Sequence, residues 1–258
     1  MRWRPILTAL GAALAAAAFS TASNAQVNAE ALRSALRQNP NFLWLDGAIV
    51  SRAGNSYGGS LSAGAFGGVT RPPHIFFGKA SSEYGTANSE LIVAKSLLHL
   101  RYNYFTTPLL YLEVLAQVQH DTFRRIAVRD LYGTGLRLNW IREKQFELFS
   151  GTTILLEQQA ISASGPFPSS SDLWARSSNY AGVNIGFDGV GNLTTVTYLQ
   201  PRLDRPKDYR LLHETILTLG ITKRLAAKIS VNLTYDHEPV AGVLPADLEV
   251  KNSLAVKF

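Results

Sequence analysis

The sequence predicts an all-β fold, a transmembrane antiparallel up-and-down β-barrel of about twelve strands that follows a cleaved signal peptide. Three observations predict it. Long segments alternate apolar and polar residues over about twice the ~5–6 residues of a typical globular strand. The connections between these segments alternate between short and long, as in bacterial barrels. The chain also stops within such a segment, on the aromatic residue Phe258.

The first 25 residues are typical of a secretory signal peptide. Arg2 and Arg4 precede the apolar stretch 6–19, and Ser23-Asn24-Ala25 supplies small residues for cleavage. A membrane-anchoring helix is the less favoured alternative, because the apolar stretch is shorter than the ~20 residues that a span needs. We therefore expect residues 1–25 to be removed during export.

Charge and cysteine content exclude several classes of site. The net charge is +6, part of it in the signal peptide, and the other basic residues are spread along the chain rather than gathered in a nucleic-acid tract. The chain has no cysteine, which removes disulfides and thiolate metal sites. We expect no cofactor, no metal and no nucleic-acid partner.

Residues 26–43 are expected to form a short helical or disordered leader before a barrel over 44–258. Ala29, Leu32 and Leu36 lie near helical spacing, and Pro40 ends the pattern. The sequence leaves open whether this leader plugs the lumen, forms a periplasmic arm or is poorly ordered.

Twelve strands are expected. In the clearest of them, Leu225, Ile229 and Leu233 share one face while Lys228 and Asn232 share the other. The first three are weaker, since glycine, serine and alanine blur their period. The predicted strands lie near 44–54, 57–68, 73–82, 89–104, 109–121, 128–142, 145–158, 179–188, 191–200, 209–222, 225–237 and 247–258.

From residue 105 onward the predicted connections alternate in length. The tight ones cover 105–108, 141–144, 188–191 and 222–224, and the longer ones cover 120–129, 159–178, 201–207 and 238–246. Short turns are expected at the periplasmic end. An even number of strands places both termini at that same end.

The last predicted strand carries Leu254, Val256 and Phe258 on one face. In a closed barrel this strand pairs with the first, because unpaired backbone groups are not tolerated in lipid. The terminal pattern resembles the assembly signal read by bacterial barrel-assembly machinery. We therefore expect that machinery and outer-membrane lipid as partners, and the bacterial outer membrane as the location.

Several stretches resemble a bacterial family of salt-induced outer-membrane proteins, domain of unknown function 481. They are DYRLLHET at 208–215, ITKRL at 221–225 and YDHEP at 235–239, with the hairpins near 104–111 and 131–138. The likeness covers 89–258 well and 44–88 thinly, and Gly54-Asn55-Ser56 matches only part of the polar stretch that follows the family's first strand. The resemblance implies a Gram-negative outer-membrane barrel of unassigned activity, without a catalytic motif.

Charged residues on the polar faces are expected to line the lumen. Glu113 and Arg137 should lie at similar heights on adjacent strands, where they could pair. Both signs of charge are present, which fits either a water-filled path with weak ion selectivity or a salt-bridge network that plugs the barrel. The expected lining residues are Lys95, Arg101, Glu113, Arg137, Glu147, Arg210, Glu214, Lys228 and Lys251, together with Glu157 and Glu249.

Two functions lead among those that the pattern allows. The first is a passive, porin-like pore for ions or small solutes. The alternative is a plugged structural or surface-interaction barrel, in which the loop 159–178, with Phe167 and Trp174, reaches outward to a partner. A soluble ligand-binding barrel is disfavoured, because its interior could not hold the apolar faces of a dozen long strands.

An outer-membrane enzyme, such as a lipid-modifying one, is a weaker alternative. His120, Asp121, Asp236 and His237 lie at outer strand ends, where such enzymes place catalytic groups. Gly54-Asn55-Ser56-Tyr57-Gly58 matches the pattern Gly-x-Ser-x-Gly, but it lies between two expected strands and not on the strand-to-helix turn of a nucleophile elbow, and the chain has no His-Glu-x-x-His pair. We therefore predict no catalytic residue.

Overall fold

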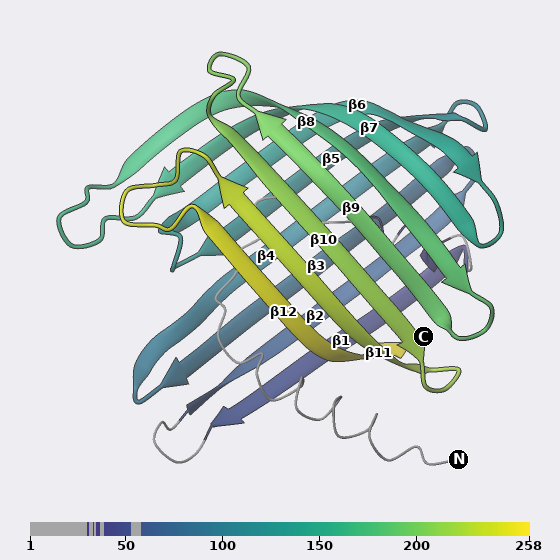
Figure 1. Cartoon of the computed structure of the whole chain (residues 1–258), viewed down its shortest axis with the longest axis horizontal. Helices are drawn as coiled ribbons and strands as arrows, with labels where there is room; N and C mark the ends of the chain where they lie inside the picture. Colours follow the sequence, from purple (N-terminus) through teal and green to yellow (C-terminus); the bar gives the residue numbers. More distant parts are fainter. Residues whose placement is uncertain (1–29, 31–32, 34, 37–38, 53–57) are drawn as a thin grey trace, which may run out of the picture.

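A computed structural model describes residues 30, 33, 35–36, 39–52 and 58–258. The predicted signal peptide lies outside the described residues. Within them the chain forms a single closed barrel of antiparallel strands, in which each strand pairs with its neighbours in sequence and the last returns to the first (Figure 1). The predicted fold class is thereby confirmed. No helix in the described part of the chain is long and apolar enough to cross a membrane.

The twelve strands are all long, and they run alternately up and down around the barrel. They are β1 (Asn41–Arg52), β2 (Gly58–Arg71), β3 (His74–Ala87), β4 (Glu90–Phe105), β5 (Leu110–Asp121), β6 (Ile126–Arg142), β7 (Phe146–Ile161), β8 (Ser170–Phe187), β9 (Gly191–Pro201), β10 (Tyr209–Gly220), β11 (Leu225–Asp236) and β12 (Ala246–Lys257).

The largest difference from the predicted strands is in β8, which begins at Ser170 rather than near residue 179. The added part is rich in serine, and the only apolar residues on its outer face are Leu173 and Ala175. The alternation of apolar and polar residues that would predict a strand is therefore missing. Pairing with β7 holds it extended nevertheless, with Glu157 opposite Trp174 and Ile161 opposite Ser170. The predicted outward loop 159–178 is therefore wrong, and the loop itself covers only 162–169.

The connections lie as predicted at two ends of the barrel. We call the end that holds the start of β1 and the close of β12 the inner end, and the opposite end the outer end. Short turns join strands at the inner end, and longer loops over 162–169, 202–208 and 237–245 lie at the outer end. The outer connection predicted as a longer one over 120–129 is wrong, because it is a four-residue turn over 122–125, as short as the inner turn over 106–109. The outer connection between β3 and β4 is shorter still: Asn88 and Ser89 have φ of 50° and 66°, as a two-residue type I′ hairpin turn requires.

The outer face of the wall is apolar. Leu100, Val114 and Ile154 are 50 to 52% exposed, which a water-soluble protein would avoid over so large an area. Rings gather at both ends of this band: His74 stacks with Tyr102 at the inner end, and Tyr209 packs against His237 at a tilted angle at the outer end. Apolar bands between aromatic girdles are typical of transmembrane barrels, and the soluble ligand-binding alternative is wrong because the apolar faces point outward.

The barrel closes through a short seam. The register between β1 and β12 runs only from Trp44 opposite Lys257 to Gly47 opposite Leu254, whereas β1 pairs with β2 along its whole length. The amide of Phe258 adds one bond to the carbonyl of Leu43, at 2.9 Å. Towards the outer end the two strands diverge, with β12 on the near wall and β1 on the far wall in Figure 1.

Candidate functional site

The barrel lumen gathers the polar side chains of all twelve strands, and the predicted lining residues divide there into two groups. Arg101, Glu113, Arg137, Glu147, Glu157 and Arg210 are buried in ion-pair networks. The remaining predicted residues, Lys95, Glu214, Lys228, Glu249 and Lys251, line a cavity. One side of the lumen is thus filled, and the other side is hollow.

An inner ion cluster fills the lumen near the inner end. Arg101 and Arg137 both pair with Glu30, whose carboxylate lies 3.3 Å from Nη1 of Arg101. Nη2 of Arg137 also lies 3.5 Å from Oε1 of Glu147, and Glu113 lies 3.8 Å from Arg101. All five side chains are at most 3% exposed, so each charge depends on its neighbours for compensation.

The predicted direct pair between Glu113 and Arg137 is not formed. Arg137 stands opposite Tyr111 in the register of β5 and β6, while Glu113 stands opposite a glycine two residues further on. Glu113 instead accepts hydrogen bonds from Nδ2 of Asn103, at 2.7 Å, and from the hydroxyl of Tyr180, at 2.5 Å. The two residues share one cluster without contacting each other.

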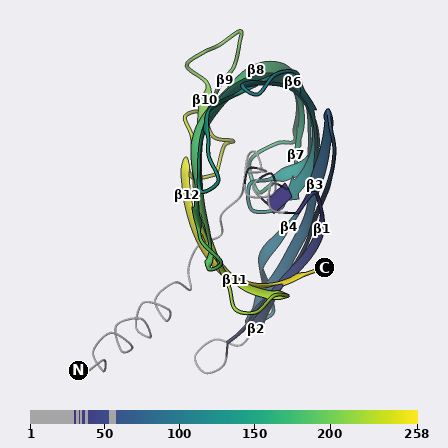
Figure 2. The ribbon, with the colours of Figure 1, turned by 90° about the vertical axis from the view of Figure 1, so that its right-hand side faces the viewer.

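The described helical residues of the leader lie inside the lumen. Glu30, Arg33, Ala35 and Leu36 are helical and buried, and this dark purple piece lies within the ring of strands in Figure 2. Arg33 donates to Oδ1 of Asn103 at 2.7 Å, and its guanidinium lies 4.2 Å from the ring centre of Tyr111.

Ala35 and Leu36 anchor the leader by apolar packing. They form one buried cluster with Phe42, Phe66 and Phe77 from the first three strands. Of the three roles that the sequence left open for the leader, these contacts fit a lumenal plug at the inner end.

An apolar layer separates the inner ion cluster from the outer one. It consists of Phe149, Tyr180, Val196, Tyr198 and Leu212, from β7 to β10. Glycine makes room for its rings: a Cβ atom at Gly151 would lie 2.3 Å from Cζ of Tyr180. The filled side of the lumen is therefore a continuous core of alternating ionic and apolar layers.

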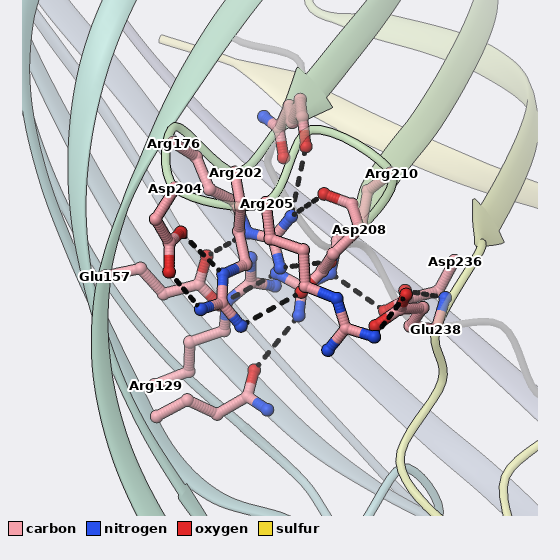
Figure 3. A network of polar contacts seen from close by, with 12 residues as sticks. Arg129, Glu157, Arg176, Arg202, Asp204, Arg205, Asp208, Arg210, Asp236 and Glu238 are labelled. Atoms are coloured by element: carbon pink, nitrogen blue, oxygen red, sulfur yellow. Dashed lines mark hydrogen bonds and ion pairs between the residues drawn. The ribbon is translucent and has the colours of Figure 1, made fainter.

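The outer ion cluster centres on one carboxylate, Glu157 (Figure 3). Arg210 and Arg176 donate to it at 2.7 Å and 3.1 Å. Nε of Arg129 lies 2.9 Å from the same carboxylate as an ion pair, at an angle too poor for a hydrogen bond. Glu157 is fully buried, so it compensates three guanidinium groups in a site with little water.

Two aspartates extend this cluster to the outer loops. Nη2 of Arg176 lies 2.8 Å from Asp208, and Nε of Arg210 lies 2.8 Å from Asp236. In the loop 202–208, Arg202 donates to Asp204 at 2.6 Å, and this bond lowers the pKa of that carboxyl. The network joins β7, β8, β10 and β11 to the loop above them.

The rim residues considered for catalysis all have structural partners. His120 contacts the carbonyl of Ala127 at 2.9 Å, and Asp121 accepts the amides of residues 123 and 124. Asp236 pairs with Arg210, and His237 lies against the ring of Tyr209 at 4.9 Å. The geometry thus brings none of these imidazoles together with a carboxylate.

The hollow side of the lumen contains three cavities in a row, which we call the side path. The outer cavity, about 180 Å³, is lined by Asp247 and by Lys95 and Asp121. The middle cavity, about 110 Å³, shares Lys95 and Asp121 with it. The inner cavity, about 640 Å³, shares Trp44 with the middle one. Lys95 and Trp44 therefore stand where neighbouring cavities meet.

Ion pairs line the side path. Lys95 lies 2.5 Å from Glu249 and 3.5 Å from Glu83. Lys251 lies 3.6 Å from Glu83, and Lys228 lies 2.9 Å from Asp46. These side chains retain 11 to 31% exposure, unlike the fully buried charges of the filled side.

Sequence reasoning missed several of the lumenal charges. Asp46, Lys79 and Glu83 lie on strands whose small residues hid the alternation, and Arg176 lay in the predicted loop. Arg129 could have been found, because it lies on the same face of its strand as Arg137 in steps of two.

Solved structures share the barrel architecture at low sequence identity. The NanC porin is 13% identical with a TM-score of 0.43, covering 84% of this chain and 97% of that one. The translocator domain of the autotransporter NalP from Neisseria meningitidis is 12% identical with a TM-score of 0.47, covering 89% and 92%. The KdgM porin is 10% identical with a TM-score of 0.40, covering 84% and 99%.

No curated protein matches the chain. A family description does: "Protein of unknown function, DUF481" matches residues 47–258. This agrees with the resemblance found in the segments between residues 104 and 239. The chain therefore belongs to the DUF481 family.

Proposed function

We propose that this protein is a bacterial outer-membrane barrel that passes ions or small solutes passively through the side path. The proposal is based on the row of three cavities, in which Lys95 lines both the outer and the middle cavity and Trp44 lines both the middle and the inner cavity. The three cavities follow one another from the outer loops to the inner end, and each adjoins the next at a residue that lines both. Polar and charged linings of this kind let a hydrated solute exchange its water for protein groups.

The proposed location in the bacterial outer membrane is based on the strand number, the turn lengths and the apolar outer surface of the barrel. An even number of strands, short turns at the end that holds the start of β1 and the end of β12, and an apolar band between aromatic girdles are all features of bacterial outer-membrane barrels. Lipid would then cover the outward leucines and valines. The barrel-assembly machinery remains the partner proposed from Leu254, Val256 and Phe258, all of which are exposed on the outer surface.

The filled side of the lumen supports a second candidate, a plugged structural barrel without transport. Arg129, Arg137, Glu113 and Glu157 are at most 1% exposed, so this side offers no route for a solute. The two candidates differ in whether the 110 Å³ middle cavity opens at its junctions.

Single-channel recording in a planar bilayer separates the two candidates. The refolded protein is first shown to be a folded barrel by its heat-shifted migration on a gel. The side path predicts small, discrete conductance steps that grow with salt concentration. Silence from protein that is verified as folded and inserted would contradict the pore and favour the structural barrel.

A further inference from the structure

Lys79 differs from the other lysines of the middle cavity. Lys95, Lys228 and Lys251 each lie within 4.0 Å of a carboxylate. Lys79 lines the same cavity, yet among the described residues its ammonium has neither an ion pair nor a hydrogen bond. Its ammonium group faces the ring of Phe66, whose centre lies 5.4 Å from Nζ.

A second ammonium group shares this ring. Nζ of Lys228 lies 4.4 Å from the centre of Phe66 while it donates to Asp46 at 2.9 Å. A ring face attracts a cation weakly and does not neutralise its charge. Asp46 therefore compensates the charge of Lys228. Among the described residues, the positive charge of Lys79 has no close counter-ion.

The acids that face Lys79 are engaged elsewhere. Glu83 and Glu249 pair with Lys95, and Asp121 accepts main-chain amides at the outer junction. Glu214, on β10, attracts Lys79 most strongly among the carboxylates, but it lies beyond ion-pair distance. An ammonium group held in a half-buried lumen without a near anion is electrostatically costly.

We infer that Lys79, with Lys228 and Phe66, forms a binding site for a small anion, in the size range of a halide or a short carboxylate. The hydroxyl groups of Ser81, Ser230 and Ser253 line the same cavity and can donate to such a ligand. A cavity of about 110 Å³ holds an anion of this size. The inference rests on the proposed function, because this cavity is the middle of the side path.

Trp44 provides an optical test, because it lines the same middle cavity as Lys79. A variant with Trp140→Phe and Trp174→Phe leaves Trp44 as the reporter in the folded barrel after signal-peptide removal. Iodide is used as an anionic quencher and acrylamide as a neutral one. We expect iodide quenching to saturate, as binding to a site requires, and acrylamide quenching to rise linearly.

Three further variants identify the residue responsible. Lys79→Met should weaken iodide binding about tenfold or more, the change expected when a charge-assisted hydrogen bond is lost. Lys79→Arg should restore it, and Lys144→Met, on an exposed turn, should leave it unchanged. Acrylamide quenching should be equal in all variants.

The outcomes separate the anion site from the path. Iodide quenching that is the same in Lys79→Met would overturn the anion site, while quenching by acrylamide would still support the path. Failure of both quenchers to reach Trp44 would overturn the path and the site together.

Discussion

The ammonium group of Lys95 lies 2.5 Å from Oε2 of Glu249, although 154 residues separate them in the chain. The contact joins β4 to β12 across the hollow side of the lumen. Because Lys95 lines both the outer and the middle cavity, this ion pair stands at the junction through which a solute would pass.

Removal of this side chain should widen the path. Lys95→Ala takes away the group between the two cavities and is expected to raise the unit conductance in a planar bilayer. Lys144→Ala is the control, because its pair with Asp188 lies on an exposed turn at 4.0 Å. Equal conductance of the two variants would show that Lys95 does not limit flow.

Release of the leader should open the inner end. Glu30→Gln combined with Arg33→Gln removes the leader's ion pairs with Arg101 and Arg137 and weakens its bond to Asn103. We expect larger and noisier current steps, because the plug is then held mainly by Ala35 and Leu36. Currents that match the wild type would mean that the leader does not obstruct the path.

The outer ion cluster should stabilise the barrel. Glu157→Gln leaves Arg129, Arg176 and Arg210 without their shared charge, and breaking a buried pair in this way costs about 3–5 kcal/mol. The free energy of unfolding can be measured by urea titration in lipid vesicles. Asp188→Asn, at an exposed pair, should change it by less than ~1 kcal/mol. A comparable loss in both variants would contradict a special role for Glu157.

The direction of the wall faces can be tested on one strand. Val231 points to the lipid side, and Val231→Arg should cost ~2–4 kcal/mol if the residue lies near the bilayer midplane. Asn232 is its inward neighbour and donates to Glu249 at 3.3 Å, so Asn232→Arg can keep an acidic partner. The fraction of protein that inserts into vesicles reports the cost, and the opposite ranking would invert the assigned faces.

The end of β12 should matter for assembly. Deletion of Phe258 removes the hydrogen bond from its main-chain amide to the carbonyl of Leu43. It also removes the aromatic end of the proposed assembly signal. We expect slower appearance of the heat-shifted folded form in cells, measured by pulse labelling. Deletion of a residue from the exposed loop 237–245 controls for chain length, and normal kinetics of the Phe258 deletion would remove the proposed signal.

Much of the wall could be predicted from the sequence, because lipid demands an apolar face at every second residue of each strand. Lys228 and Asn232 illustrate this, since neighbouring leucines and valines fix their direction. The pairing inside the lumen could not be predicted in the same way. Glu113 and Arg137 miss each other by two positions of register, and the partner of Arg137 is Glu30, a residue before the barrel.

The outer part of β8 could not be predicted from the sequence either. Ser170 and Ser171 extend the strand beyond the apolar band, where water accepts either kind of side chain. Their extended backbone depends on pairing with Ala160 and Ile161 of β7, which a local period cannot reveal. Backbone pairing therefore continues where the hydrophobic pattern has already stopped.

The short seam between β1 and β12 makes closure of the barrel depend on the last residues of β12. All of its register falls on Leu254 to Lys257, so a chain that stops short of Leu254 has eleven paired junctions and still cannot become a cylinder. Such a product would remain an open sheet with two free edges, a form that a protease or chaperone can distinguish from the finished protein. The barrel can therefore close only when residues Leu254 to Lys257 of β12 are present.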